Sequence, residues 1–410
     1  MPVFKSKIIN DPIYGFVTIQ DEIIDALINH PYFQRLRRIK QLGLTNLVYP
    51  GALHTRFHHA IGAMHLMSEA LQVLKGKDVE ISADESRGAL IAILLHDIGH
   101  GPFSHSLEHS IVRGINHEVI SSLLMDDLNK EFKGKLSIAI KIFNNKYEKK
   151  FLHQLVSSQL DMDRLDYLKR DSFFTGVSEG IISSDRIIKT LNVVKDNLVV
   201  EAKGIYSIEK FLISRRLMYW QVYLHKTVLS AENLLINILK RAKELSSSKT
   251  KLFATPAFSL FLENDFTKED FLNRPELLQK FAQLDDYDVM ASVKAWTESE
   301  DFILSTLCKN MLDRNLYKIE LQTEAIATSH KNNLIDKAVK KYEITRKEAS
   351  YFVFSESVNN SAYNNSDHGI NILYSNGKTV DVATASDLLN IQALSQPVTK
   401  HYICYPKDLS

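Results

Sequence analysis

The stretch LLHDIGHGPFSH, residues 94–105, places three histidines and an aspartate at the end of an apolar run. That run, GALIAILL at residues 88–95, has the composition of a helix in the core of the molecule. A buried carboxylate beside a buried imidazole costs several kcal/mol unless another group compensates it, and a metal ion is a common compensation. His96 and Asp97 are therefore candidate metal ligands.

Further candidate ligands lie on two other predicted helices. The segment TRFHHAIG, residues 55–62, supplies His58 or His59, and LDMDRLDYLKRD, residues 160–171, supplies Asp161 or Asp163. Histidine is also concentrated in this part of the chain, because nine of the 15 histidines lie between residues 54 and 117. Even spacing would place only two or three there.

Each of these segments has a simpler explanation when it is taken alone. The two adjacent histidines could be surface residues, and the aspartates could belong to a solvated helix face with pairs such as Asp166 and Arg170 at i, i+4. The order His…His-Asp…Asp on three predicted helices favours one shared site instead. Two imidazoles with one or two carboxylates suit a divalent ion such as Fe, Mn or Zn.

Composition excludes several other classes of protein. The chain has 410 residues, 45% of them hydrophobic and 24% charged, with a net charge of +1, so nothing in its overall charge indicates nucleic acid or membrane binding. Two cysteines, Cys308 and Cys404, are too few for a disulfide framework or a thiolate zinc site. No apolar run reaches the roughly 18 residues of a membrane span, and residues 1–10 lack a secretory core. We expect a cytoplasmic protein.

The pattern of elements predicts a mainly α protein in two parts. In residues 1–245 we expect helices over about 31–42, 56–75, 151–170 and 207–245, a helix that begins at a Ser82–Glu85 capping box, and a hairpin around 193–202. The polar segment SSSKTK, residues 246–251, marks a boundary. Residues 246–410 mix helical and strand-like segments and predict a smaller α+β part.

The chain also resembles a known family, segment by segment. FQRLRRIKQLG, YPGALHTRFHHAIG, HDIGHGPFSH, NHE, LDMDRLDYLKRD and YLHK are similar to segments of the HD-domain deoxynucleoside triphosphate triphosphohydrolases, which include the vertebrate SAM-and-HD-domain enzyme and bacterial relatives. The resemblance runs from about Ile8 to Leu239, and we expect no SAM domain ahead of it. It implies an HD phosphohydrolase catalytic domain in residues 1–245 and an assembly or regulatory role for residues 246–410.

The resemblance implies a set of metal ligands and a reaction. The ligands of one divalent metal (Fe, Mn, Zn or Mg) would be His59, His96, Asp97 and Asp163, and Mg²⁺ or Mn²⁺ would accompany the triphosphate. Family members release a deoxynucleoside and intact tripolyphosphate, so the leaving 5′ oxygen needs a proton. The matching catalytic residues are His105, Glu108, His117 and His100, the last facing the phosphates. Glu108 stands where the family usually has aspartate.

Substrate contacts are implied in the same way. Three arginines match positions that grip phosphate oxygens, two residues match positions that hold the 3′ hydroxyl, and three line the sugar or crowd its 2′ carbon: Arg56, Arg164 and Arg215; Gln41 and Asp171; Tyr167, Leu42 and Tyr223. Asn29 replaces an aspartate that reads an activating guanine, and Tyr219 replaces a histidine. Guanine-specific activation and base preference are therefore not carried over.

Two other functions fit part of the same pattern. One is another HD phosphohydrolase, a nucleotidase or a phosphodiesterase, and the other is a nucleotide-binding regulator without activity. For the preferred reading the expected partners are the dNTP substrate, a dNTP or other nucleotide activator, and further copies of the chain in a dimer, tetramer or hexamer. Neither a membrane nor nucleic acid is indicated.

Overall fold

Helix α4 (Ala83–Leu95), which carries the apolar run, begins where the sequence predicts. In the computed structural model of the protein, the hydroxyl of Ser82 accepts a hydrogen bond from the Glu85 N–H at 3.2 Å, and the Glu85 carboxylate accepts one from the Ser82 N–H at 2.8 Å. Residues 91–95 are fully buried. The helix packs against α3 (Arg56–Lys75) and α7 (Ser137–Phe143), so its C-terminal end, at His96, lies inside the protein.

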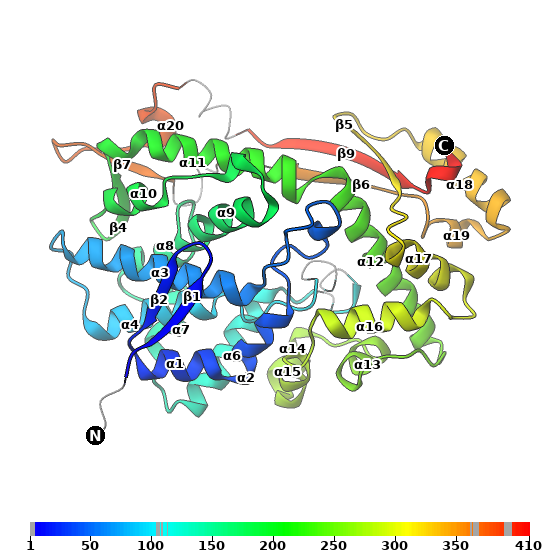
Figure 1. Cartoon of the computed structure of the whole chain (residues 1–410), viewed down its shortest axis with the longest axis horizontal. Coiled ribbons are helices and arrows are strands. Elements are labelled where there is room, and N and C mark those ends of the chain that lie inside the picture. The colour runs from blue at the N-terminus through cyan, green and yellow to red at the C-terminus, as the bar shows by residue number, and fades with distance from the viewer. Residues whose placement is uncertain are drawn as a thin grey trace.

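The described residues, 5–103, 107, 110–112, 114–360, 363, 369–388 and 396–410, form a mainly α fold, as predicted (Figure 1). The other helices up to the predicted boundary are α1 (Glu22–Asn29), α2 (Pro31–Gln34), α6 (His117–Glu131), α8 (Lys150–Val156), α9 (Met162–Thr175), α10 (Ser184–Thr190), α11 (Ile205–Met218) and α12 (Lys226–Ser247). Beyond it lie α13 (Pro256–Glu263), α14 (Lys268–Asn273), α15 (Pro275–Phe281), α16 (Asp286–Trp296), α17 (Phe302–Leu312), α18 (Thr328–Tyr342), α19 (Arg346–Ala349) and α20 (Val382–Ala385). Among the helices described, none is long and apolar enough to cross a bilayer.

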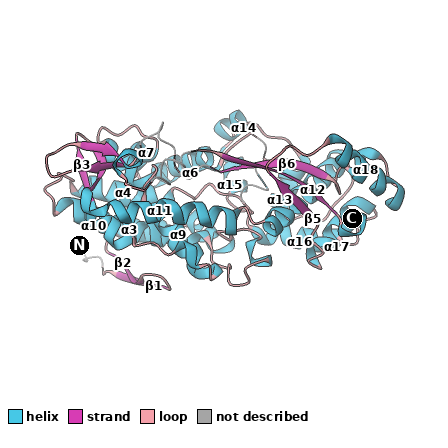
Figure 2. Ribbon diagram, turned by 90° about the horizontal axis from the view of Figure 1, so that it is seen from above, coloured by secondary structure: helices cyan, strands magenta, loops and turns pink. Residues whose placement is uncertain are grey.

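The strands form small groups among the helices (Figure 2). An N-terminal hairpin pairs β1 (Lys7–Asp11) with β2 (Gly15–Ile19), and a three-stranded antiparallel sheet has β9 (Val398–Tyr405) between β5 (Lys318–Gln322) and β6 (Phe354–Asn360). The predicted hairpin is present as β3 (Leu191–Val194) and β4 (Asn197–Glu201). Strand β7 (Asn371–Leu373) pairs with β4 in parallel, and β8 (Thr379–Asp381) follows it, so the chain returns across the predicted boundary.

Three predicted helices are shorter or broken in the structure. The segment from Pro31 leaves the α-helix at Gln34 and is a 3₁₀ helix over Arg35–Arg38, because the backbone beyond it pairs with residues 54–56. The Arg56 N–H donates to the Ile39 carbonyl, and the Gln41 N–H donates to the His54 carbonyl, both at 3.0 Å. This pairing holds residues 39–41 against the start of α3. The predicted bounds of α3 are confirmed.

The other two breaks lie at the predicted site. The expected helix over 151–170 is two helices, α8 and α9, because Asp161 caps the start of α9 instead of continuing the helix. The expected helix over 207–245 is interrupted by a π-helical turn, Tyr219–Tyr223, and by the extended backbone of His225 before α12. Single π-helical turns inside helices often occur at functional sites.

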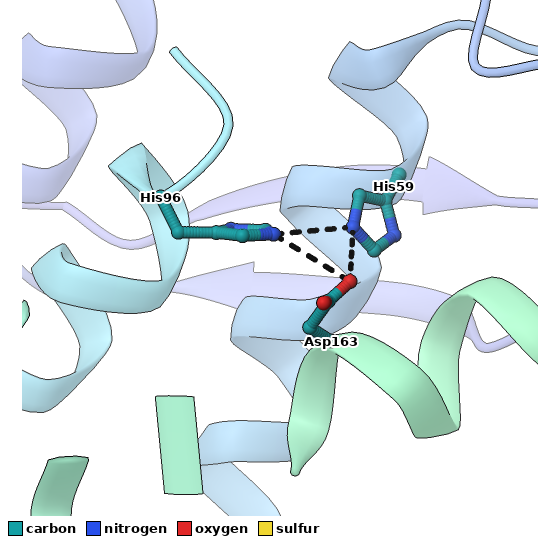
Figure 3. Close-up of side chains that lie close together, drawn as sticks. All are labelled: His59, His96 and Asp163. Atoms are coloured by element: carbon teal, nitrogen blue, oxygen red, sulfur yellow. Dashed lines mark hydrogen bonds and ion pairs between the residues drawn. The ribbon is translucent and has the colours of Figure 1, made fainter. Parts of the chain in front are cut away.

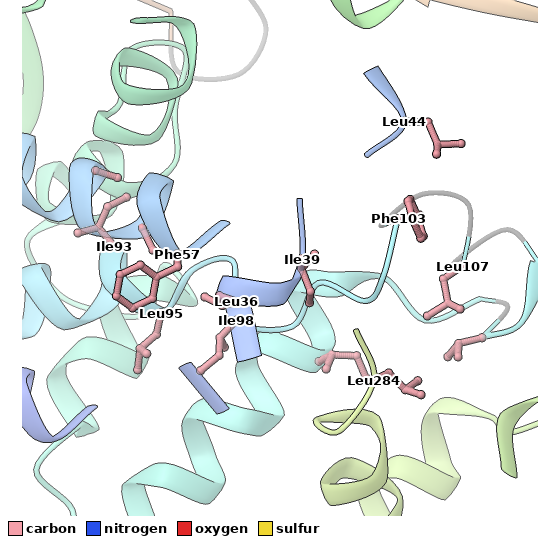
Figure 4. Close-up of a cluster of buried hydrophobic side chains, with 14 of the residues drawn as sticks. Leu36, Ile39, Leu44, Phe57, Ile93, Leu95, Ile98, Phe103, Leu107 and Leu284 are labelled. Atoms are coloured by element: carbon pink, nitrogen blue, oxygen red, sulfur yellow. The ribbon is translucent and has the colours of Figure 1, made fainter. Parts of the chain in front are cut away.

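The N- and C-terminal parts meet at the segment that follows α4. Figure 4 shows buried side chains of Leu36, Phe103 and Leu284, among others, in one cluster. The fully buried guanidinium of Arg35 donates to the Leu284 carbonyl at 3.0 Å and to the Ile98 carbonyl at 2.6 Å. Residues beyond the predicted boundary therefore support the chain directly after His96 and Asp97.

Asp286, at the start of α16, bridges the same two segments. One carboxylate oxygen accepts the Lys40 N–H at 2.9 Å, and the other accepts the Phe103 N–H at 3.1 Å. Asp286→Ala leaves the buried Phe103 N–H and the partly buried Lys40 N–H without this partner, so we expect the free energy of unfolding to fall by about 1–3 kcal/mol in urea unfolding. The control is Tyr287→Ala, which removes the neighbouring, 68% exposed side chain. Equal stability of the two variants would contradict the bridging role.

Candidate metal centre

Three side chains from three helices meet at one point in the core. His59 is on α3, His96 follows α4, and Asp163 is in the first turn of α9 (Figure 3). His59 Nε2 lies 3.1 Å from Asp163 Oδ1 and 3.4 Å from His96 Nε2, and His96 Nε2 lies 3.6 Å from Asp163 Oδ1. Ligands about 2.1 Å from one ion at angles of 90–110° lie about 3.0–3.4 Å apart, so this spacing fits a shared cation.

Asp97 lies at the edge of the same group. Its Oδ1 is 3.3 Å from His96 Nε2, and its Oδ2 is 3.9 Å from His59 Nε2. The guanidinium of Arg56, the first residue of α3, donates to Asp97 Oδ2 at 2.5 Å. The structure thus groups three of the four residues predicted as ligands, His59, His96 and Asp163, and places Asp97 beside His96.

The hydrogen bonds of the two imidazoles direct one ring nitrogen of each toward that point. His96 Nδ1 donates to the Ile93 carbonyl at 2.6 Å, and His59 Nδ1 donates to Asp166 Oδ2 at 2.7 Å. The Nε2 atom of each ring is therefore the atom that can bind a cation, an arrangement typical of histidine ligands. Two imidazole nitrogens with carboxylate oxygens are a donor set that fits a divalent Fe, Mn or Zn ion.

The charge at this point also favours a cation. Burial lowers the pKa of His59, but hydrogen bonds to Asp163 and Asp166 outweigh it and raise that pKa to about 10. Burial raises the pKa of Asp163, and the two imidazoles outweigh it, so its pKa lies well below the usual range. A site that binds a proton this tightly concentrates negative charge, and a divalent cation would displace that proton on binding.

The structure separates the residue pairs that the sequence left open. His58 Nδ1 accepts the Thr55 N–H at 3.2 Å and completes the capping box of α3. Asp161 caps α9, accepting the Ser158 N–H at 2.8 Å and the Arg164 N–H at 2.7 Å. His58 and Asp161 therefore begin helices, and their neighbours His59 and Asp163 point into the cluster.

A buried ion-pair network behind His59 was not predicted. Arg170 donates to both oxygens of Asp166 at 2.9 Å and to Asp11 at 2.8 Å, and the side chains of Arg170 and Asp166 have no exposed surface. The alternative reading of the Asp166–Arg170 pair as a solvated face is therefore wrong. The i, i+4 spacing fits both readings, so the spacing alone does not reveal the burial.

The predicted catalytic histidines are only partly described. His100 is buried, with Nε2 3.3 Å from Asp97 Oδ1, and its ring stacks on that of His117 at a centroid distance of 3.8 Å. Burial and the nearby Arg56 lower the pKa of His100 to about 3, so its imidazole is neutral at physiological pH. The predicted pair His105 and Glu108 lies outside the described residues.

The predicted sugar-binding residues lie along α9 and the π-helical turn. Asp163, Tyr167 and Asp171 recur every four residues and so share one face of α9. The Tyr223 hydroxyl donates to Asp171 Oδ2 at 2.7 Å, and His54 Nε2 donates to Asp171 Oδ1 at 2.8 Å. His54 was not predicted as a site residue, although it belongs to the dense histidine group in the sequence.

The remaining residues predicted to bind the phosphates or the sugar include Arg164, which pairs with Asp161 at 3.2 Å. Arg164 Nε donates to the Ser158 carbonyl at 2.7 Å, and Arg215 Nη1 donates to Gln159 at 3.1 Å. Burial raises the pKa of the Tyr167 hydroxyl, and the charges of both arginines oppose that rise. Within the described part of the chain, the buried polar atoms of predicted site residues that have no hydrogen-bond partner include Tyr167 Oη, Gln41 Oε1, Arg215 Nε and His100 Nδ1. Leu42 is partly buried against the core.

Comparison with known proteins identifies the domains around this centre. Residues 56–171 match the HD domain family, and residues 182–256 match the HD associated region. A solved phosphohydrolase from Bacteroides thetaiotaomicron is 52% identical, with a TM-score of 0.95 over 98% of this chain and 100% of that one. The Bacillus subtilis protein YwfO is 33% identical over 99% of this chain and 93% of its own length.

More distant relatives carry a named activity. The deoxynucleoside triphosphate triphosphohydrolase SAMHD1 homolog of Dictyostelium discoideum is 30% identical over 77% of this chain and 60% of its own length. The SAMHD1 protein of Gallus gallus with the same activity is 27% identical over 66% of this chain and 53% of its own length. The chain thus spans little more than half the length of these two relatives.

The paired aspartates and histidines give a matched test of the ligands. We expect Asp163→Asn and His59→Ala to lower affinity for Mn²⁺ by more than about 100-fold, because loss of an outer partner alone costs 10–100-fold. Asp161→Asn and His58→Ala should retain Mn²⁺, since they alter helix starts only. Calorimetric titration of metal-free protein, with metal content after dialysis, measures the effect. Retention of Mn²⁺ by Asp163→Asn would refute the assignment.

Proposed function

The chain belongs to the HD-domain phosphohydrolase family, and we propose that it hydrolyses deoxynucleoside triphosphates to a deoxynucleoside and inorganic tripolyphosphate. The observation that carries this proposal is the single face of α9 that presents Asp163, Tyr167 and Asp171. These residues span about 12 Å along the helix, the scale of a nucleotide, from the metal centre to the Asp171–Tyr223 pair. Relatives named as deoxynucleoside triphosphate triphosphohydrolases support the same substrate.

In this proposal, the metal centre lies at the end of the site that binds the α-phosphate. His59, His96, Asp97 and Asp163 would hold the cation, which when bound lowers the pKa of a water molecule and neutralises charge on phosphorus. The neutral, buried His100 lies beside Asp97, where it can donate a hydrogen bond to a phosphate oxygen. Arg164 and Arg215 supply positive charge for the remaining phosphates.

In the proposed reaction, a water oxygen bonds to the α-phosphorus while the bond from that phosphorus to the 5′ oxygen breaks. The water contributes a hydroxyl to the tripolyphosphate and, in net terms, one proton to the 5′ oxygen. We assign transfer of that proton to His117, stacked on His100, and to His105 with Glu108. A histidine suits the task because its unperturbed pKa is near physiological pH.

The other end of the site can select deoxyribose. Asp171 and Gln41 would hold the 3′ hydroxyl, since the Gln41 Oε1 atom is buried without a partner in the described residues. Leu42 and Tyr223 would stand against the 2′ carbon, so that a ribonucleotide's extra hydroxyl is crowded or left without a hydrogen bond. A nucleotide activator and homo-oligomeric assembly stay predictions of the sequence resemblance.

The product pattern tests the proposed reaction. We expect purified protein with Mn²⁺ or Mg²⁺ to convert dNTPs, supplied singly and as mixtures, to deoxynucleoside and tripolyphosphate, resolved by ion-exchange chromatography. Asp163→Asn should lose at least about 1,000-fold in rate, because the cation it holds contributes several kcal/mol to the barrier reduction. Asp161→Asn, the helix-cap control, should remain active.

Other products would identify another function. Monophosphate or diphosphate products would overturn the triphosphohydrolase proposal in favour of a nucleotidase or phosphodiesterase. Absence of turnover with every dNTP mixture and metal would favour a nucleotide-binding regulator. The positive charges of Arg164 and Arg215, which act on the Tyr167 hydroxyl, support the triphosphate substrate over both alternatives.

Discrimination against ribonucleotides gives a separate prediction. Leu42→Ala should raise turnover of ribonucleoside triphosphates relative to dNTPs by about tenfold, because a contact of this size contributes 10–200-fold to specificity. The control is Leu47→Ala, a leucine that is likewise partly buried against the core. The ratio of kcat/KM for a matched dNTP and rNTP measures the effect. An unchanged ratio in Leu42→Ala would remove Leu42 from the sugar site.

A further inference from the structure

The turn of the N-terminal hairpin is tied to the core by one side chain. Asp11, the last residue of β1, accepts the N–H groups of Ile13 and Tyr14 with Oδ1, at 2.8 and 3.1 Å. Its other oxygen, Oδ2, accepts a hydrogen bond from Arg170 Nη1 at 2.8 Å. The Asp11 side chain is only 2% exposed. One carboxylate thus shapes the turn and pairs with a buried cation 159 residues away.

Arg170 connects that turn to the metal centre. Its guanidinium is shared between Asp11 on one side and both oxygens of Asp166 on the other. Asp166 Oδ2 in turn accepts the hydrogen bond from Nδ1 of His59, whose Nε2 lies 3.1 Å from Asp163. A continuous series of hydrogen-bonded charges therefore runs from the hairpin turn to a metal ligand.

The packing around Arg170 leaves the space that this series of hydrogen bonds requires. Gly62 is on α3, three residues after His59, and a Cβ there would lie 2.1 Å from both Arg170 Nη2 and Asp166 Oδ1. Only glycine allows the Arg170–Asp166 pair to lie this close to α3. The ring of Tyr14, from the same hairpin turn, covers the Arg170 guanidinium at 5.6 Å. Two residues of the turn thus contact the network.

From these contacts we infer that Asp11 is a positioning residue for the metal centre, and that docking of the hairpin and binding of a divalent cation stabilise one another. With Asp11 in place, Arg170 is balanced by two carboxylates and Asp166 is free to orient His59. Without Asp11, the positive charge of Arg170 is balanced by Asp166 alone. Asp166 then accepts the hydrogen bond from His59 Nδ1 less strongly, and His59 Nε2 becomes a poorer ligand. Thermodynamic linkage makes the effect reciprocal: if docking of the hairpin raises the affinity for the cation, binding of the cation stabilises the docked hairpin by the same free energy. The inference rests on the proposed metal centre and not on which nucleotide is hydrolysed.

Asp11→Asn breaks the series at one atom. The amide oxygen of asparagine can still accept the Ile13 and Tyr14 N–H groups, while an NH₂ group replaces Oδ2 and faces the Arg170 donors. We expect Mn²⁺ affinity to fall about tenfold in calorimetric titration of metal-free protein without nucleotide, the lower end of the effect of an outer partner. Thermal unfolding verifies that the variant is folded at the temperature of titration.

Asp21 provides a matched control in the same part of the chain. Its Oδ1 accepts the N–H groups of Ile23 and Ile24 at 2.8 and 3.1 Å, and its Oδ2 accepts Arg87 at 2.6 Å. Arg87 also pairs with Asp84, at the start of α4 and remote from the ligands. Asp21→Asn should therefore bind Mn²⁺ within twofold of wild type. Equal affinities of the Asp11→Asn and Asp21→Asn variants would overturn the inference.

Hydrogen exchange tests the reciprocal effect without any substitution. In the wild-type protein, Mn²⁺ should slow exchange of the Ile13 and Tyr14 amides, both bonded to Asp11, and leave the Ile23 and Ile24 amides unchanged. No slowing at Ile13 and Tyr14, or equal slowing at both pairs, would overturn the coupling. A wild-type protein that binds no Mn²⁺ would overturn the metal centre as well, whereas Mn²⁺ binding without dNTP turnover would count only against the proposed substrate.

Discussion

Three carboxylates lie in the helical core, Asp97 and Asp166 buried and Asp163 partly buried, and matching their charge is the constraint on which this structure depends. Asp97 is matched by Arg56 and Asp166 by Arg170, each through a direct hydrogen bond. Among the described residues, Asp163 pairs with the imidazoles of His59 and His96. The pKa values of His59 and His96 are raised there, so a proton on an imidazole matches this charge, and a divalent cation would displace that proton on binding. Such a cation would bind side chains from α3, from the end of α4 and from α9, and would link these three helices.

Regular helices carry most of the site's side chains, and the breaks between helices set where those helices begin. The bounds of α3 and the start of α4 were predictable from local signals, because a capping residue precedes each apolar run. The break before α9 was not predictable, because the sequence allows Asp161 to be either a metal ligand or a helix cap. Only its N–H partners in the structure identify it as a cap. The π-helical turn at Tyr219–Tyr223 contains neither Gly nor Pro, and its Tyr223 hydroxyl bonds to Asp171 from a distant helix. Long-range hydrogen bonds of this kind leave no local pattern in a sequence.

The same reasoning explains how much of the site could be predicted. His96 and Asp97 follow from a polar pair at the end of an apolar run, and residue order suggests one histidine from residues 55–62 and one aspartate from residues 160–171. The choice between adjacent histidines depends on which imidazole faces inward, and that is set by the Thr55–His58 capping bond. The contribution of residues beyond 245 was likewise hidden, because the contacts of Arg35 and Asp286 join segments about 250 residues apart. Such pairings carry no period or spacing that a single sequence reveals.

Arg170, buried between two carboxylates, raises the question of why the core contains ions at all. Replacing a buried ion pair by well-packed apolar side chains is often neutral or stabilising, so stability alone gives no reason to retain one. The network does what apolar residues cannot, because it ends on Nδ1 of His59 and fixes which ring nitrogen faces the centre. Gly62 supports this reading, since a glycine inside α3 weakens the helix and is explained here by the space that the pair requires. The ions behind His59 are thus best understood as part of the site, with the hairpin turn as their outer end.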